Sequence, residues 1–142
     1  QHGAQLLYAD GEATVPKITI TLRKSYGGSH IVMGCKQLRS DLNFAWPSSE
    51  IAVMGASGAV AILCGKEAKA KKEAGEDVQA FLAEKEDEYT EKFANPYEAA
   101  SYGYIDDVIE PRNTRFRICR GLAQLATKRQ QLPAKKHGCM PM

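Results

Sequence analysis

Short strand-like runs alternate with helix-like segments along this chain, and that alternation limits the folds open to it. In the run KITITLR, residues 17–23, two isoleucines and a leucine fall on one face and two threonines on the other, which is typical of a strand. Three further runs predict strands: LNFAW at 42–46, EIAVMG at 50–55 and YIDDVIE at 104–110. Strands that alternate with helices predict an α/β fold with mainly parallel strands.

The segments between these runs carry apolar residues at helical spacing. We expect helices over residues 3–13, 29–39, 55–74, 76–94, 97–103 and 114–126. Gly75 is expected to end or kink the third of these helices, and Gly103 to close the fifth. Thr114 is the predicted cap of the last helix, whose apolar face comprises Ile118, Cys119, Leu122, Leu125 and Ala126. No internal repeat is visible.

Composition places the chain among ordinary globular proteins. Its 142 residues are 44% hydrophobic and 25% charged, enough for one domain or a piece of one. The net charge is +2, and only residues 133–140, PAKKHGCM, are locally basic, so we interpret them as a solvated end and expect no nucleic-acid partner. No apolar run approaches the about 18 residues of a membrane span. The chain opens without Met on a helix-like segment, which indicates an excised part of a longer protein.

Cysteine and histidine usage argues against a metal site. The four cysteines form no CxxC pair, and the three histidines are isolated, so no zinc site is expected. We interpret the thiols as reduced and expect the first three, at positions 35, 64 and 119, to face the core, whereas Cys139 lies in the tail. Reduced thiols favour the cytoplasm, or the mitochondrial matrix in a eukaryote.

Gly27 and Gly28 lie where a strand gives way to a helix, and two explanations fit them. Glycine permits a positive φ angle, so the pair can form a simple tight turn, which the spacing alone favours. A helix start also offers unpaired N–H groups that bind anions, or an oxyanion that exists only during a reaction. Both explanations remain open at this point.

Four other features have an ordinary interpretation. MGASGAV, residues 54–60, lacks the ending of a phosphate loop, so its glycines are expected to serve packing. His30 has no Cys, Ser or acidic partner that the sequence identifies for a triad. Asp106 and Asp107 point to opposite faces of a strand, so they do not serve one ion; we interpret them as polar groups at a strand end or as part of a salt bridge between subunits. The charged stretch 66–92 is either a solvated helix face with ion pairs or a docking face for a neighbouring subunit.

Three long segments resemble one enzyme family. They are EATVPKITITLRKSYGGSHIVMG at 12–34, DLNFAWPSSEIAVMGASGAV at 41–60 and NPYEAASYGYIDDVIEPRNTR at 95–115. All three are similar to the biotin-dependent acyl-CoA carboxyltransferases, which include β subunits of propionyl-CoA and acetyl-CoA carboxylases, the large subunit of methylmalonyl-CoA carboxyltransferase (transcarboxylase) and related decarboxylases. The resemblance covers nearly the whole chain.

The resemblance implies a fold and an assembly. The fold is crotonase-like (ClpP/crotonase), a spiral of ββα units, and residues 1–142 would be the C-terminal portion of the C-terminal domain in a two-domain subunit. Such subunits form hexamers, in which the N-domain of one subunit meets the C-domain of another at the active site. Biotin carboxylase and the biotin carrier are the implied partners.

The resemblance also implies a reaction and its residues. Carboxyl would move between N-carboxybiotin and a short acyl-CoA, such as propionyl-CoA or acetyl-CoA, without a metal. The backbone N–H groups of Gly28 and Ser29 would form an oxyanion hole for the ureido oxygen of biotin. The resemblance further implies that Gly27, His30 and Ile31 lie at the substrate site. No side-chain base is required, because biotin itself can take the α-proton.

Two departures from the family pattern and two alternatives accompany this expectation. Many relatives have Ala-Tyr where this chain has Ser29-His30, and some have Asp at the position of Ile31, which leans away from a strict propionyl-CoA enzyme. One alternative is a biotin-dependent acyl-CoA decarboxylase subunit. The other is a non-catalytic piece that only folds and oligomerises, since the isolated chain is expected to be silent. A hydratase or isomerase is disfavoured, because no paired glutamates flank the glycines.

Overall fold

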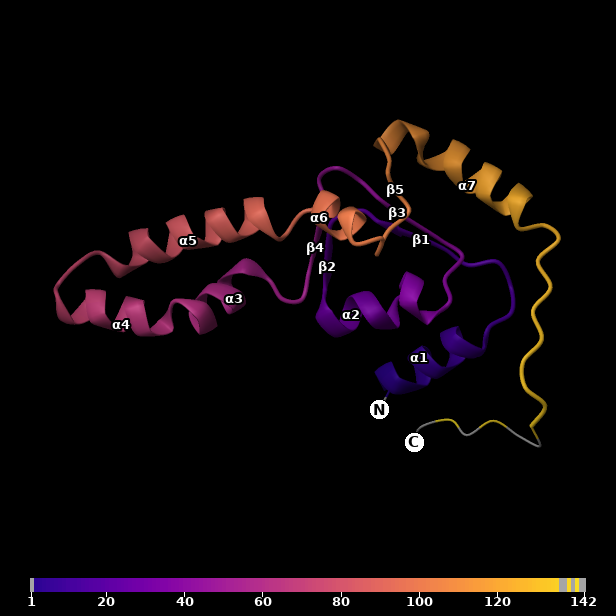
Figure 1. Cartoon of the computed structure of the whole chain (residues 1–142), viewed down its shortest axis with the longest axis horizontal. Helices are drawn as coiled ribbons and strands as arrows, with labels where there is room; N and C mark the ends of the chain where they lie inside the picture. The colour runs from indigo at the N-terminus through magenta and orange to yellow at the C-terminus, as the bar shows by residue number, and fades with distance from the viewer. Residues whose placement is uncertain (1, 136–137, 139, 141–142) are drawn as a thin grey trace.

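The computed structural model describes residues 2–135, 138 and 140 (Figure 1). The elements in chain order are α1 His2–Glu12, β1 Ile18–Thr21, β2 Lys24–Tyr26, α2 Gly27–Val32, the 3₁₀ turn η1 Lys36–Leu38, β3 Leu42–Ala45, β4 Glu50–Ala52, α3 Ala56–Leu63, α4 Gly65–Glu73, α5 Val78–Lys92, α6 Pro96–Ser101, β5 Asp107–Val108, the 3₁₀ turn η2 Pro111–Asn113 and α7 Thr114–Gln124. Each strand pair among the described residues is parallel. The α/β class is therefore confirmed.

Two ββα units follow one another and stack in register. The first consists of β1, β2 and α2, and the second of β3, β4 and α3. β1 pairs with β3, while β2 pairs with β4 in a separate two-stranded sheet; β5 then adds to β3. This repeated ββα unit agrees with the expected crotonase-like fold. The sequence hides the repeat because β2 and β4 have only three residues each, too few to show a periodicity.

The core of the molecule lies where the second ββα unit meets α6 and the segment before β5. Ala45, Ile51, Ala99 and Ile105 form one buried cluster there, and Ala45 is fully buried. Two of these four side chains come from strands at least 48 residues before the other two, so the cluster joins distant parts of the chain. Burial of these apolar groups drives the association of the sheet with α6.

Helix α7 packs closely on the β1–β3 sheet through a glycine. A Cβ at Gly121 would lie 2.7 Å from Cδ1 of Leu42 and 3.0 Å from Cδ1 of Ile18, so a bare backbone allows the helix to approach the sheet. The predicted cap is wrong: Thr114 is already the first helical residue, and its hydroxyl accepts a hydrogen bond from Nε1 of Trp46 at 2.9 Å.

The expected apolar face of α7 is only partly buried. Ile118 and Leu125 are half-buried against the sheet, whereas Cys119 and Leu122 are exposed. The prediction that the first three cysteines face the core therefore holds for Cys35 and fails for Cys119, while Cys64 is half-buried; all three are free thiols. Cys139 and two further residues of the basic tail, Lys136 and His137, lie outside the described residues.

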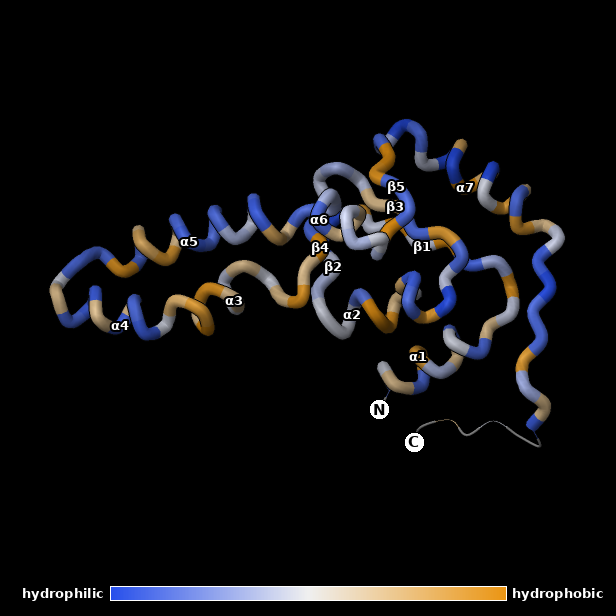
Figure 2. Tube along the Cα trace, viewed as in Figure 1, coloured by the Kyte–Doolittle hydropathy of each residue, from blue (hydrophilic) through white to orange (hydrophobic). Residues whose placement is uncertain are grey.

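Helices α3, α4 and α5 form an arm that projects from the body (Figure 1). The predicted helix 55–74 breaks at Cys64 into α3 and α4, and Gly75, with a φ of 75°, ends it as expected. The ion pairs Lys71–Glu76 and Lys85–Glu88 confirm a solvated, charged face. Figure 2 shows apolar and polar residues mixed along the arm. Docking of the arm on a neighbouring subunit stays a prediction.

A cluster of charged residues connects the start of β1 to α1 and to the segment after α7. The side-chain ammonium of Lys17 donates to the backbone oxygen of Asp10 at 2.7 Å. The backbone N–H of Lys17 donates to the Asp41 carboxylate at 2.7 Å. Lys128, beyond α7, donates to the same carboxylate at 2.8 Å. Burial disfavours the charged form of Asp41, but the hydrogen bonds from Lys128 and Lys17 outweigh it, so the pKa of Asp41 is lowered.

The described residues contain neither a membrane-spanning helix nor a cluster of metal-binding side chains. None of the helices within 2–135 has the length and hydropathy needed to cross a bilayer. No group of three His, Cys, Asp or Glu side chains that could hold a metal ion occurs in the same part of the chain.

We expect core truncation to destabilise the chain far more than truncation on the arm. Ile105→Ala removes a side chain that is 3% exposed, and should lower the free energy of unfolding by about 2–5 kcal/mol. Ile62→Ala, at a position that is 71% exposed, should change it by less than about 0.5 kcal/mol. Urea unfolding followed by circular dichroism measures both, and equal losses would contradict the core assignment.

Candidate functional site

Helix α2 begins at Gly27, immediately after β2 ends. Tyr26 precedes it in an extended conformation, with φ −117° and ψ 134°, and offers no side-chain cap. The first N–H groups of any helix have no acceptor within the helix. Since no side chain of the described residues caps α2, the N–H groups of Gly28 and Ser29 are left to solvent or a ligand.

The two glycines serve different purposes. Gly27 has a φ of 48°, and a Cβ there would lie only 2.7 Å from the carbonyl oxygen of Val53. Gly28 has no such φ angle, and a Cβ there would meet no atom within 4 Å. The tight turn and the close contact with Val53 therefore explain why residue 27 is a glycine. They do not explain Gly28, whose backbone faces open space.

Two side chains hold the strand end that precedes this turn. The phenol of Tyr26 donates to the carboxylate of Glu50, and its ring lies against Gly55, where a Cβ would be 3.4 Å from the ring. Burial, followed by the Glu50 contact, raises the pKa of Tyr26 to about 12, so the phenol stays protonated. The packing role expected for the MGASGAV segment is confirmed at Gly55.

Ser29 and His30 make hydrogen bonds within the same ββα unit. The hydroxyl of Ser29 donates to the backbone oxygen of Tyr26 at 2.6 Å, so its proton is used inside the turn. Nδ1 of His30 lies 2.9 Å from Oγ of Ser25. The structure thus supplies a serine contact that the sequence did not identify. No carboxylate among the described residues is hydrogen-bonded to His30, so a triad is not formed.

His30 is half-buried, and burial lowers the pKa of its imidazole. The charged form is disfavoured because part of its hydration is lost on folding. A lowered pKa keeps the ring neutral near pH 7. Neutral imidazole has one N–H donor and one bare acceptor nitrogen, so Nδ1 either donates to Oγ of Ser25 or accepts from its hydroxyl.

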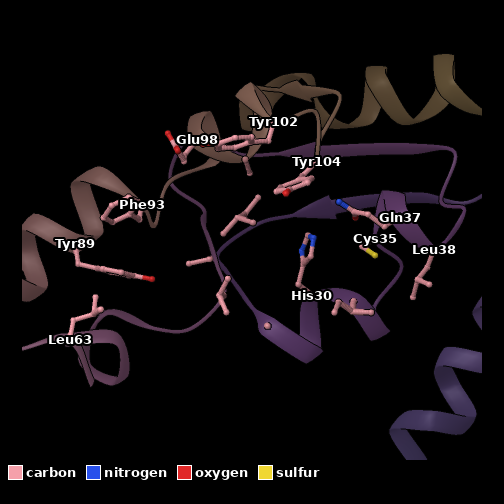
Figure 3. A pocket seen from close by; sticks show the side chains of 16 residues that line it. His30, Cys35, Gln37, Leu38, Leu63, Tyr89, Phe93, Glu98, Tyr102 and Tyr104 are labelled. Atoms are coloured by element: carbon pink, nitrogen blue, oxygen red, sulfur yellow. The ribbon is translucent and has the colours of Figure 1, made fainter. Parts of the chain in front are cut away.

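A pocket of about 930 Å³ opens beside α2. Gly27, His30 and Ile31 line it from the helix, and Figure 3 shows the imidazole of His30 pointing into it. The structure thus brings these three predicted residues together. Gly28 and Ser29 are not in its lining, although Ser29 and His30 share a second hollow of about 460 Å³ beside β1 and β2.

The opposite wall of the large pocket is aromatic, and sequence reasoning did not assign it to a site. Its rings come from α5 and from the chain after α6: Tyr89, Phe93, Tyr102 and Tyr104 (Figure 3). The Tyr102 and Tyr104 rings stack, with centroids 5.9 Å apart. The sequence places Tyr89 and Phe93 on a helical stripe, but only tertiary contacts bring that stripe opposite α2.

The two adjacent aspartates bind separate basic partners. The carboxylate of Asp106 accepts from Lys36 at 2.5 Å and from the backbone N–H of Asn43 at 2.8 Å. Asp107 pairs with Arg117. Both therefore stabilise the edge of the sheet around β5, and the interpretation of them as strand-end polar groups is confirmed.

Alanine substitutions at the two glycines should separate their roles. Gly27→Ala forces a side chain into the left-handed region, at about 1–2 kcal/mol, and against the Val53 carbonyl, so it should lower the free energy of unfolding by more than about 1 kcal/mol. Gly28→Ala should change it by less than about 0.5 kcal/mol. Urea unfolding of both variants is the measurement, and a larger loss for Gly28→Ala would refute the distinction.

The lowered pKa of His30 predicts a loss of stability in acid. The unfolded chain, with a histidine pKa near 6.5, binds the proton more tightly than the folded chain. The free energy of unfolding therefore falls as the pH drops below about 6.5, until the folded pKa is passed. His30→Gln should lose less stability than the unmodified chain between about pH 7.5 and pH 5.5 in urea titrations. Equal losses would show that His30 does not contribute.

Comparison with known proteins identifies the family. Residues 1–140 match the carboxyl transferase domain family. The chain is 51% identical over 142 residues to the propionyl-CoA carboxylase beta chain of Saccharopolyspora erythraea, covering 100% of this chain and 26% of that protein. It is equally 51% identical over 142 residues to the methylmalonyl-CoA decarboxylase subunit alpha of Propionigenium modestum, covering 100% and 27%.

A solved structure extends the likeness to three dimensions. The transcarboxylase 12S hexamer, determined with methylmalonyl-CoA and methylmalonic acid bound, matches with a TM-score of 0.88 and 53% identity, over 99% of this chain and 26% of that one. The chain thus spans about a quarter of the length of these relatives. The match over residues 1–140 and the shared fold show that the chain belongs to the carboxyl transferase domain family.

Proposed function

We propose that this chain is the C-terminal portion of the C-terminal domain of a two-domain subunit that moves a carboxyl group between biotin and a short-chain acyl-CoA. Identities of 51–53% to carboxyl-transferring relatives support the activity, and coverage of about a quarter of their length supports the placement in a longer subunit. The observation that carries the proposal is Gly28, whose bare backbone faces open space at the uncapped start of α2.

The residues of this chain fit biotin. A Cβ at Gly28 meets nothing within 4 Å, so a ring can approach the backbone there. The large pocket is mostly apolar, which suits the apolar body of such a ligand, and the hollow beside β1 and β2 adds polar groups that can orient it, among them Thr19, Ser25 and Ser29. When bound, biotin supplies a ureido ring that can carry a carboxyl group.

The chain contributes hydrogen bonds from its backbone. The N–H groups of Gly28 and Ser29 at the uncapped start of α2 would hold the ureido oxygen of bound biotin, where such donors would favour negative charge. Gly27 fixes the direction of these donors because its turn is held against Val53. His30 and Ile31 line the adjacent pocket and contact the substrate. These groups require no side-chain base.

Partners and setting follow from the same proposal. A biotin carboxylase and a biotin carrier protein deliver the carboxylated ring, and the subunit assembles as a hexamer, as the solved transcarboxylase 12S does. The acyl group is propionyl or acetyl, with Ile31 as an aliphatic contact. The compartment is the cytoplasm, or the mitochondrial matrix in a eukaryote.

A decarboxylase subunit is the second candidate. The relative from Propionigenium modestum, named a methylmalonyl-CoA decarboxylase subunit, is as similar as the carboxylase chain, at 51% identity. Both activities need the same transfer between an acyl-CoA and biotin, so the residues of this chain serve either one. A third possibility is that the 142 residues alone only fold and associate, without turnover.

A chimera tests the proposal. This chain replaces the matching 142 residues of the Saccharopolyspora erythraea propionyl-CoA carboxylase beta chain. The chimera should decarboxylate methylmalonyl-CoA or malonyl-CoA only when free biotin is present, while the 142 residues alone should be silent. A folded, hexameric chimera without biotin-dependent turnover would overturn the proposed activity.

Substitution of Gly28 in the chimera tests the oxyanion hole. Gly28→Pro removes the N–H, and should reduce kcat by roughly 10²–10³-fold, the usual effect of losing one such donor. Gly28→Ala keeps the N–H and is the matched control, expected to lose much less. Circular dichroism and gel filtration check that Pro has not disturbed folding or assembly. Equal activity of the Pro and Ala variants would remove Gly28 from the oxyanion hole.

A further inference from the structure

The hydrogen bond between Ser25 and His30 bears on which nitrogen of the imidazole carries the proton. Nδ1 of His30 lies 2.9 Å from Oγ of Ser25, and no other hydrogen bond of either side chain is found among the described residues. If Nδ1 carried the proton and donated it, the Ser25 hydroxyl would still need an acceptor for its own proton. If the hydroxyl donates to Nδ1, the contact uses the hydroxyl proton and leaves the N–H at Nε2 free to donate elsewhere.

The location of His30 allows an N–H group at Nε2 to donate to a ligand in the pocket. On the α2 wall of the pocket, between Gly27 and Ile31, His30 is the only polar side chain. Figure 3 shows its ring extending from α2 toward the aromatic residues opposite. A hydrogen-bond donor in such a place orients a ligand whose other contacts with α2 are apolar.

We propose that Ser25 donates to Nδ1 of His30, so that the neutral ring keeps its proton on Nε2 and donates it to a carbonyl oxygen of the substrate in the pocket. His30 then binds substrate, and Ser25 is a positioning residue that sets the tautomer and the ring direction. The inference rests on the proposed function, because that function supplies the two candidate carbonyl groups: the urea of biotin and the thioester of the acyl-CoA.

Three features of the site favour this arrangement. Ser25 lies on β2, which pairs with β4 at Ser25↔Ile51, so the hydroxyl is held on a fixed strand rather than a loop. Burial keeps the ring neutral, so it has one donor nitrogen and not two. Ser29, the other nearby hydroxyl on α2, has its proton engaged with the Tyr26 backbone.

Two substitutions at His30 provide a matched test in the chimera. The amide nitrogen of Gln reaches the position of Nε2, whereas that of Asn reaches only the position of Nδ1. His30→Gln should therefore keep the KM of the bound substrate close to its original value, and His30→Asn should raise it roughly three- to tenfold, with kcat less affected. A rise in the KM of free biotin identifies the urea, and a rise in the KM of methylmalonyl-CoA identifies the thioester.

The positioning role of Ser25 has its own test. Ser25→Ala should raise the same KM, and Ser25→Thr, which keeps the hydroxyl, should restore it. Equal KM values for the Gln and Asn variants, or better binding by Asn, would overturn the inference while leaving the proposed activity intact. A chimera without biotin-dependent turnover counts against the proposed activity instead.

The tautomer can be measured without turnover. The 142-residue chain is labelled with ¹⁵N in its histidine rings, and the nitrogen chemical shifts of His30 show which atom carries the proton. We expect the proton on Nε2 in the unmodified chain, and a changed Nδ1 shift in Ser25→Ala. A proton on Nδ1 in the unmodified chain would refute the inference, whatever the kinetics show.

Discussion

The parallel pairing of β2 with β4 is the contact on which the candidate site depends. It aligns Tyr26 with Ala52, so the residue after each strand end lies beside its counterpart in the next unit. Gly27 then meets the carbonyl oxygen of Val53 at a distance that excludes any side chain. This close contact between the backbones at Gly27 and Val53 restricts the path of the turn. The direction of α2, and of its free N–H groups, follows from it.

The site divides its work between backbone and side chains. The backbone at Gly28 and Ser29 offers two donors that cost no reorganisation, since the helix start already points them outward. The side chains of His30 and Ile31 face the pocket. In the proposed function biotin itself takes the proton, so the chain needs to supply only donors and a shaped cavity.

Much apolar surface of the described residues remains uncovered. Val53 is 80% exposed and Tyr102 68%, and both line the pocket beside α2. Leu63, also in its lining, belongs to the projecting arm, whose mixed surface Figure 2 shows. Exposed apolar groups of this extent on one face are typical of surfaces that meet another part of an assembly. That character agrees with a chain that spans about a quarter of its relatives.

The sequence by itself determined the α/β class with mainly parallel strands and offered a tight turn as one explanation of the Gly27-Gly28 pair, because period-two alternation and the backbone freedom of glycine are local properties. Tertiary structure alone decided that Gly28 faces open space, that Ser25 holds His30 and that Tyr102 and Tyr104 form the opposite wall. Those relations join side chains across a turn, or across some 70 residues of sequence, and packing creates them. The wrong prediction of a cap at Thr114 has the same origin. Nε1 of Trp46, from a distant part of the sequence, donates to the Thr114 hydroxyl.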